Sequence, residues 1–472
     1  RPSPISACLV GSEMCIRDSR DSLNMEKDAP VRRRSSGDGA DVIATSRRLN
    51  DSKTQSQYEP YKQAEWGFVN HWYPAVFSEE LEEDQVEGVQ ICGIPIVLRR
   101  VNGRVYALKD RCIHRGVRMS AKPMCFNKET ISCWYHGFTF NLETGNLDTI
   151  VGNPDDKLIG TTGVTPYPTE EKCGIVFVFV REDDFPLDEV PPLAHDLPLA
   201  FPDNSERFPH PLWPAAPHIL HEDAVGLGIH RTGESNWRVA CENGFDNAHI
   251  LIHQDNMIVQ SNNWVLPLGI RPVSNDCITT FEDDNGPSGL MQWLFSDRWE
   301  PILENETLGI KVNGVNGRPY RTSFYLPGVL LVENWPEEYI AQYEWYVPIT
   351  DDTYEYWEVL VKRCPTEEER EQFKYRYKSV LEPMALRGFN NCDLYARESM
   401  QDFYGDGSGW NDEQLVDTDV SPITWRKLAS RCNRGIARPG VGVTGSVKAS
   451  SLRLRDVSEG SPSRYFVRKV DF

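Results

Sequence analysis

The sequence has no long apolar run, no excess of positive charge and few cysteines. A membrane-spanning helix needs about 20 consecutive apolar residues, and the longest obvious apolar run, Ile175 to Val180, has only the length of a strand. The formal net charge is −20 at pH 7, whereas a protein that binds nucleic acid needs a basic face. We therefore expect neither a transmembrane helix nor nucleic-acid binding.

The cysteines are too sparse for a disulfide-stapled scaffold. There are 12 of them in 472 residues, far below the density of small secreted proteins. Thiols spread in this way are typical of a reducing compartment, where they stay reduced or bind metal. The sequence therefore predicts a cytoplasmic protein, and its length allows two or three domains with their own cores.

Four regions are expected along the chain. Residues 1–57 are rich in Arg, Ser and Asp and lack apolar periodicity, which predicts a disordered or non-native leader. Residues 58–185 contain strand patterns after a short N-terminal helix, including a hairpin with an Asn-Gly turn at Asn102. Residues 186–440 mix strands and helices, and residues 441–472 are polar and aperiodic, which indicates a flexible tail. The predicted fold class is α+β, with an all-β N-terminal domain.

Three helices are predicted in the C-terminal half from their end signals. One starts near Pro365, with Thr366 and three glutamates in its first turn, suited to the positive end of the helix dipole. Another is expected to begin after Pro383. The third has Ser421 as N-cap and Pro422 at its first position, and Gly435 ends it.

Two cysteine–histidine pairs lie on loops between predicted strands of the N-terminal region. Cys112-x-His114 and Cys133-x-x-His136 each supply one thiolate and one imidazole. In a zinc finger the cysteines usually pair with each other. Mixed pairs suit a Rieske [2Fe–2S] cluster, in which one iron takes two thiolates and the other takes two imidazoles. The alternatives are a zinc ribbon or four unrelated core residues.

A second group of metal-binding side chains follows in the C-terminal region. His249 and His253 are four residues apart, which on a helix places both imidazoles on one face, with Asp246 three residues earlier. Asp393, near the start of a predicted helix, is the best candidate for a third ligand. Two imidazoles and a carboxylate form the facial triad of a mononuclear Fe(II) site. The alternatives are a structural histidine pair and an aspartate that only faces a helix dipole.

An apolar substrate pocket is expected beside these ligands. Phe389 lies one turn before Asp393, and Ile250 adjoins His249, so both side chains can line it. The predicted pocket comprises Gly244, Phe245, Ile250, Phe389 and Asn390.

Together the motifs resemble those of Rieske non-haem iron aromatic-ring-hydroxylating oxygenases. The similarity is to their terminal oxygenase (α) subunits, and most of all to the carbazole dioxygenases. It is carried by "NHWYP" (70–74), "ISCWYH" (131–136), "NWRVACENGFDNAHILIH" (236–253) and "FNNCDLYARESMQDFY" (389–404). It extends from residue 58 to residue 440.

This resemblance implies a Rieske β-domain joined to a helix-grip (START-like) catalytic domain. It implies one [2Fe–2S] cluster and one Fe(II) per chain, a homotrimer without β subunits, and electrons from NAD(P)H through a reductase and a ferredoxin. It also implies that Asp246 bridges the two metal centres, bonding His249 and reaching His136 of the partner subunit. The implied reaction inserts both atoms of O₂ into an aromatic or N-heteroaromatic substrate, by angular or cis-dihydroxylation.

Two alternative functions are compatible with the same motifs. One is a Rieske monooxygenase or demethylase on the same scaffold, which labelled O₂ distinguishes by the number of oxygen atoms in the product. The other is a pure electron-transfer Rieske protein, which would hold two irons per chain instead of three.

Overall fold

The computed structural model describes residues 58–198, 216–283, 286–294, 296–315 and 320–438. The predicted leader, 1–57, and the predicted tail, 441–472, lie outside these residues. No helix in the described part of the chain is long and apolar enough to cross a membrane.

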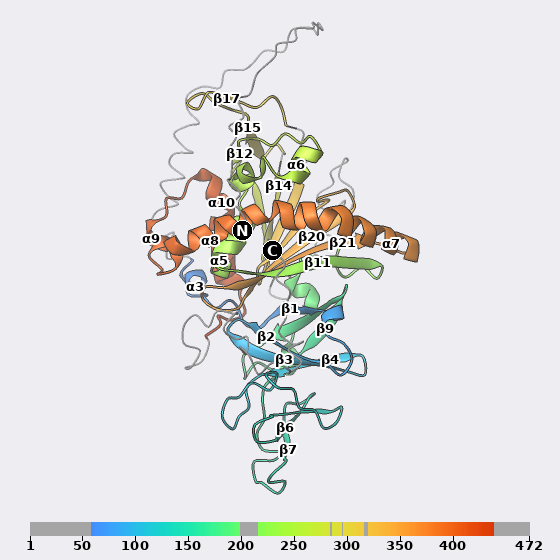
Figure 1. Cartoon of the computed structure of the whole chain (residues 1–472). Helices are drawn as coiled ribbons and strands as arrows, with labels where there is room; N and C mark the ends of the chain where they lie inside the picture. The colour runs from blue at the N-terminus through green and yellow to red at the C-terminus, as the bar shows by residue number, and fades with distance from the viewer. Residues whose placement is uncertain (1–57, 199–215, 284–285, 295, 316–319, 439–472) are drawn as a thin grey trace, which may run out of the picture. The chain divides into compact units, whose positions relative to one another are not determined.

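The N-terminal region is built from three small antiparallel sheets (Figure 1). The first joins β1 (His71–Phe77), β10 (Ile175–Val180) and β9 (Thr169–Lys172). The second joins β2 (Val86–Ile91), β3 (Ile94–Val101), β4 (Arg104–Lys109) and β8 (Pro166–Tyr167). The third joins β5 (Thr130–Ser132), β6 (Phe138–Asn141) and β7 (Leu147–Ile150), and the loop of Cys133 and His136 connects β5 to β6.

The predicted hairpin is confirmed as β3 and β4. Its two-residue turn has φ angles of 52° at Asn102 and 74° at Gly103. Positive φ at both central residues is what a type I′ turn requires, and this turn matches the twist of the strands it joins. The turn fixes the register that leads β4 directly into the loop of Cys112 and His114.

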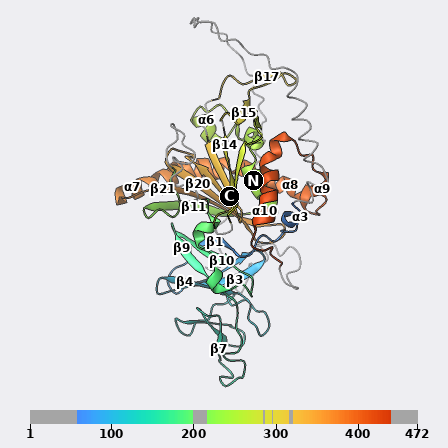
Figure 2. The ribbon, with the colours of Figure 1, turned by 180° about the vertical axis from the view of Figure 1, so that it is seen from behind.

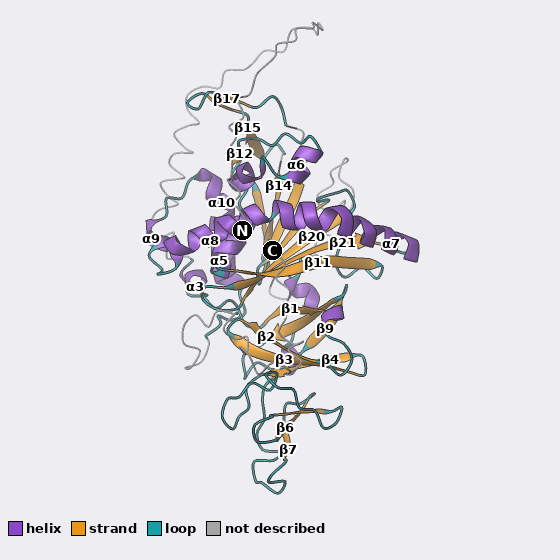
Figure 3. Ribbon diagram, in the orientation of Figure 1, coloured by secondary structure: helices purple, strands orange, loops and turns teal. Residues whose placement is uncertain are grey.

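The C-terminal region contains a seven-stranded antiparallel sheet covered by helices (Figure 3). Its strands, in spatial order, are β11 (Ala224–Gly233), β21 (Tyr354–Arg363), β20 (Ile340–Pro348), β19 (Val329–Glu333), β18 (Tyr320–Tyr325), β14 (Gly289–Leu294) and β13 (Ile278–Phe281). Two short pairs accompany it: β12 (Gly269–Pro272) with β15 (Trp299–Ile302), and β16 (Glu304–Asn305) with β17 (Ile310–Lys311).

A long helical run lies across the sheet in Figure 1. It consists of α7 (Glu367–Arg376), η5 (Tyr377–Phe389) and α8 (Asn391–Tyr404). The other α-helices among the described residues are α3 (Glu59–Lys62), α5 (Trp237–Phe245), α6 (Met257–Ser261), α9 (Gly409–Asp412) and α10 (Val420–Cys432), with α10 contacting α3 and α5 (Figure 2). The short 3₁₀ helices are η1 (Ser78–Glu80), η2 (Leu187–Glu189), η3 (Leu193–Asp196), η4 (Ala248–His253) and η6 (Asp417–Asp419). The predicted α+β class is confirmed.

The helix predicted to start near Pro365 is confirmed as α7. Thr366 caps α7, accepting a hydrogen bond from the Glu369 N–H while the Glu369 carboxylate bonds back to the cap. The third helix, α10, has Asp419 as N-cap, two residues before the predicted Ser421. The helix predicted to begin after Pro383 is wrong, because η5 is a π-helix that runs through this proline. The wider π turn leaves room for a ring that would crowd an α-helix.

One apolar core joins the N-terminal sheets to the seven-stranded sheet. It contains residues of β1 and β10 together with residues of β19, β20 and β21. The rings of Phe177 on β10 and Trp345 on β20 lie 5.9 Å apart. A second core contains Tyr61 of α3, whose ring meets Trp237 of α5 edge-on at 5.9 Å. Thus α5, which precedes the predicted iron ligands, is anchored in packed aromatic side chains.

A buried arginine offers a test of this packing. Arg426 on α10 is 1% exposed and donates to Glu242 of α5 at 2.7 Å and to Glu413 at 2.9 Å. Arg426→Met would leave both carboxylates without their cation, so we expect the free energy of unfolding to fall by about 3–5 kcal/mol. Urea denaturation at fixed protein concentration measures it. Arg431→Met, which removes an exposed ion pair with Glu282, is the control and should change stability by less than about 1 kcal/mol. An equal effect of both variants would contradict the prediction.

Candidate metal centres

The two cysteine–histidine loops have matching backbone turns. In each loop a glycine four residues after the cysteine donates its N–H to the cysteine carbonyl, Gly116 at 2.8 Å and Gly137 at 2.9 Å. Both glycines have φ of 70°, a conformation that other residues rarely adopt. These tight turns bury Cys112 and Cys133, at 3% and 1% exposure, while the histidines stay exposed.

The four predicted cluster ligands form two close pairs, one of histidines and one of cysteines. The Nδ1 atoms of His114 and His136 face each other at 3.1 Å, and the His114 ring is stacked on Phe138 at 4.8 Å. Burial, reinforced by the neighbouring thiol of Cys133, raises the pKa of the Cys112 thiol to about 11. Metal binding favours the thiolate form and so offsets the free-energy cost of deprotonating this buried pair of thiols. Two buried thiols beside two facing imidazole nitrogens therefore fit a Rieske cluster.

The second predicted ligand set also comes together. His249 and His253 belong to η4, and Asp393 lies in the first turn of α8. One ligand atom from each lies within 4.8 Å of the others. Asp393 Oδ1 is 3.4 Å from His249 Nε2 and 3.6 Å from His253 Nε2. This arrangement is suited to a facial triad around one divalent cation.

Hydrogen bonds on the far side of each imidazole orient it for metal binding. The main-chain carbonyl of Asp246 accepts from His249 Nδ1, and Asn256 Oδ1 accepts from His253 Nδ1 at 2.8 Å. Both Nε2 atoms therefore present lone pairs toward Asp393. His253 Nε2 and Asp393 Oδ1 are buried and have no hydrogen-bond partner. Such orphaned atoms are costly unless a cation binds them, so the residues fit an iron ion.

The helix that carries the two histidines differs from the prediction. We expected both imidazoles on one helical face, but η4 is a 3₁₀ helix. With three residues per turn, positions four apart are rotated by about 120° from each other. The rings of His249 and His253 accordingly meet edge-on, 5.3 Å apart and at 76°. The ligands converge because Asp393 lies between them, and not because they share a face.

Asp246 ends α5 and starts the turn into η4. Its carboxylate accepts a hydrogen bond from the Ala248 N–H at 2.7 Å, and burial raises its pKa. The contact between Asp246 and the His249 ring is made by the main-chain carbonyl, whereas the prediction assigned it to the carboxylate. The bridging role of Asp246 stays a prediction.

The five predicted pocket residues have different surroundings. Phe389 stacks on His253 with 3.7 Å between ring centroids and 8° between planes. Gly244 lies so close to the Tyr346 hydroxyl that any side chain would clash with it. Ile250 packs beside the cluster of Ile270 and Trp299.

The other two point into the protein. Phe245 is 1% exposed and is stacked on Phe324 at 5.5 Å, and Asn390 donates to Glu358 at 2.6 Å. Of the predicted pocket residues, Phe389 thus contacts a predicted iron ligand, His253.

Asn256 is a site residue that the sequence reading missed. Besides accepting from His253, its amide donates to the Gly388 carbonyl and to Cys392 Sγ, each at 3.3 Å. It therefore connects the His253 ring to the segment that carries Asp393. The only sequence signal is its position three residues after His253, which is too common to identify it.

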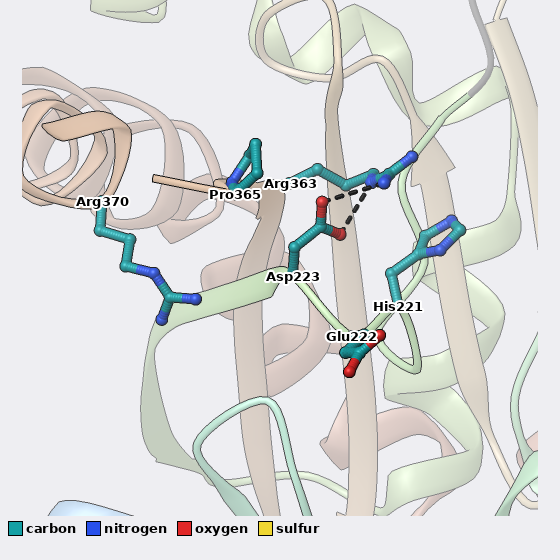
Figure 4. Close-up of a pocket in the computed structure, with 6 residues that line it drawn as sticks. All are labelled: His221, Glu222, Asp223, Arg363, Pro365 and Arg370. Atoms are coloured by element: carbon teal, nitrogen blue, oxygen red, sulfur yellow. Dashed lines mark hydrogen bonds and ion pairs between the residues drawn. The ribbon is translucent and has the colours of Figure 1, made fainter. Parts of the chain in front are cut away.

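An open surface pocket of about 480 Å³ lies apart from these residues (Figure 4). It is lined by His221, Glu222, Asp223, Arg363, Pro365 and Arg370. Arg363 and Asp223 form a two-pronged ion pair at 2.8 and 2.9 Å. None of the predicted site residues lines it.

Comparison with known proteins supports both domains. A Rieske [2Fe-2S] domain matches residues 71–162, and the homotrimeric ring hydroxylase family matches residues 183–437. The chain is 40% identical over 387 residues to the terminal oxygenase component of carbazole 1,9a-dioxygenase from Metapseudomonas resinovorans, covering 80% of this chain and 94% of that protein.

Two solved structures are similar along most of the chain. A component of 2-oxoquinoline 8-monooxygenase is 70% identical with a TM-score of 0.83, covering 85% of this chain and 94% of that one. A chain from the reduced oxygenase–ferredoxin complex of carbazole 1,9a-dioxygenase is 38% identical with a TM-score of 0.73, covering 84% and 96%.

A Rieske domain followed by this catalytic domain defines a Rieske-type terminal oxygenase. The chain belongs to the homotrimeric ring hydroxylase family. The predicted family, enzyme class and terminal-oxygenase function are thereby confirmed, and so is the predicted pair of cofactors, a Rieske cluster and a mononuclear iron. The individual ligand assignments stay predictions.

Removal of the amide that orients His253 should weaken iron binding. In Asn256→Ala the His253 ring loses its Nδ1 acceptor, so we expect the affinity for Fe(II) to fall about tenfold or more. Titration of apo-protein with Fe(II) measures this, and the visible spectrum of the cluster reports an intact Rieske domain. Asn262→Ala is the control. It removes a hydrogen bond from an exposed side-chain amide to the Ile258 carbonyl. Equal affinities in the two variants would exclude this role for Asn256.

Proposed function

We propose that this chain hydroxylates a fused N-heteroaromatic ring with O₂. The observation that carries the proposal is the triad of His249, His253 and Asp393, with two buried ligand atoms that lack a hydrogen bond, in a chain that also has a Rieske domain. When bound, ferrous iron at this site supplies the activation of O₂ with electrons from the Rieske cluster. The residues around it orient the ligands and keep the site apolar.

In this proposal three side chains hold the iron and leave room for substrate. His249 and His253 present Nε2, and Asp393 presents Oδ1. The face of His253 is covered by Phe389, and Trp335 lies 4.9 Å from Phe389. These rings form an apolar wall that excludes water and gives a flat aromatic substrate a surface to stack on. Gly244 and Ile250 are the other predicted wall residues.

We also propose that Cys112, His114, Cys133 and His136 hold the cluster. Because the cysteines are buried and the histidines exposed, the histidine side of the cluster is the side available to another subunit. In a homotrimer, His136 of the partner subunit would then approach Asp246, and the Asp246 carbonyl already contacts His249. Asp246 is the residue we assign to electron transfer between subunits.

The electrons are proposed to come from NAD(P)H through a reductase and a ferredoxin. A carbazole 1,9a-dioxygenase oxygenase of the same fold forms a complex with a ferredoxin, which supports this partner. We further propose a cytoplasmic location. The cysteines in the described residues are free thiols, as expected where thiols are kept reduced.

The number of oxygen atoms inserted has two candidate answers. Insertion of both atoms, as predicted from the sequence, is supported by the carbazole 1,9a-dioxygenase relative at 40% identity. Insertion of one atom is favoured by the 2-oxoquinoline 8-monooxygenase component at 70% identity. Both relatives are named for fused ring systems that contain nitrogen, so the substrate class is the same in either case.

Turnover with ¹⁸O₂ tests the function and separates the two candidates. The oxygenase, a matching ferredoxin and reductase, and NADH are incubated with 2-oxoquinoline, carbazole or naphthalene, and products are analysed by mass spectrometry. We expect labelled product from at least one N-heteroaromatic compound. Two labelled atoms indicate dioxygenation, whereas one labelled atom with the second in water indicates monooxygenation. Hydroxylation of naphthalene alone would contradict the proposed substrate class.

Loss of the Asp246 carboxylate should separate metal content from turnover. We expect Asp246→Ala to retain cluster and iron but to lose NADH-driven turnover by about 100-fold, because electron transfer to the iron is interrupted. Iron and sulfide analysis and product formation measure the two quantities. Asp255→Ala, at an exposed acid nearby, should keep both. Full turnover in Asp246→Ala would rule out the bridge.

A further inference from the structure

Three residues of α8 that are spaced by four share one face of the helix. They are Asp393, Arg397 and Gln401. Asp393 lies in the ligand set, while the other two bond to α5. Arg397 Nε donates to Asn243 Oδ1 at 2.6 Å, and Gln401 Oε1 accepts from the main-chain N–H of Asn236 at 2.6 Å. Asn236 is the N-cap of α5 and Asn243 lies in its last turn, so α8 holds α5 at both ends.

Arg397 is surrounded by groups that fix its direction. It is 1% exposed, donates to the Tyr354 hydroxyl at 3.3 Å, and lies 4.5 Å from the centre of the Tyr356 ring. A buried cation is costly unless it is bonded, and a planar guanidinium can make these contacts together only in one orientation. The Arg397 side chain therefore fixes the position of α8 relative to α5.

Asn243, which accepts the hydrogen bond from Arg397, is connected in turn to His249. The Asp246 N–H donates to the Asn243 carbonyl at 3.2 Å, and the Asp246 carbonyl accepts from His249 Nδ1. A chain of bonds thus runs from α8 through Arg397, Asn243 and Asp246 to one imidazole. The same helix α8 carries Asp393 only one turn before Arg397.

We propose that Arg397 is a positioning residue which, with Asn243 and Gln401, sets α8 against α5 and holds Asp393 within ligand distance of His249. This inference rests on the proposed iron site. It assigns a role in metal binding to residues that touch neither metal nor substrate.

Fe(II) titration of the full-length apo-protein tests it. In Arg397→Met and Arg397→Lys we expect the affinity for Fe(II) to fall about tenfold or more, because neither side chain can make the contacts of the planar guanidinium. Asn243→Ala should have a similar effect. The double variant Arg397→Met/Asn243→Ala should bind Fe(II) no more weakly than the single variant with the lower affinity. A second readout is the electron paramagnetic resonance signal of the ferrous site probed with nitric oxide, which should broaden. The cluster spectrum should not change.

Three comparisons decide the result. Tyr404→Phe removes a bond from the far end of α8 to Glu413 and should keep the wild-type affinity. Wild-type affinity and signal in Arg397→Lys or in Asn243→Ala would overturn the proposal, and Asn243→Ala decides alone if Arg397→Met does not fold. Asp393→Ala separates the two hypotheses: if it keeps its iron, the proposed iron site is wrong. If it loses iron while Arg397→Lys and Asn243→Ala do not, only the positioning role is wrong.

Discussion

The site depends on buried ligand atoms that nothing else in the described protein satisfies. His253 Nε2 and Asp393 Oδ1 are removed from water without a hydrogen bond, which costs free energy until a cation is bound. The surrounding structure maintains this unfavourable arrangement. Asn256 and the Asp246 carbonyl hold the imidazoles, Phe389 covers one ring, and α8 is bonded to α5 at both ends. The fold thus supplies the free energy that keeps three ligands directed toward one point.

The two candidate metal centres use similar residues but differ in how deeply the histidines are buried. At the Rieske loops, tight glycine turns bury the thiols and leave the imidazoles exposed, which suits a group that must exchange electrons with another protein. At the proposed iron site, His253 and Asp393 are buried at 1% and 4% exposure, which suits chemistry that must exclude water. The difference arises from position: loop ends in the first case and a helix-covered sheet in the second.

Sequence reading succeeded where the signal was local. The Asn102 turn, the helix start near Pro365 and the cysteine–histidine pairs each depend on residues within a few positions, and each lies where it was predicted. It failed where tertiary packing decides. The π-helix through Pro383 and the 3₁₀ geometry of η4 depend on neighbours that are distant in sequence. Asn256 and Arg397 could not be identified, because an asparagine or an arginine acquires a role only from the partners that the fold brings to it.

The core shared by β10 and β20 limits how such enzymes can diverge. Trp72 and Trp345 belong to different domains by family match, yet they lie in one apolar cluster. A Rieske domain exchanged from a distant relative would therefore have to bring a matching surface with it, since a poorly fitted core loses stability. Recombination of whole domains is penalised, whereas changes in the loops are not. Substitution around the proposed iron site leaves this shared core intact, whereas exchange of one half would disturb it.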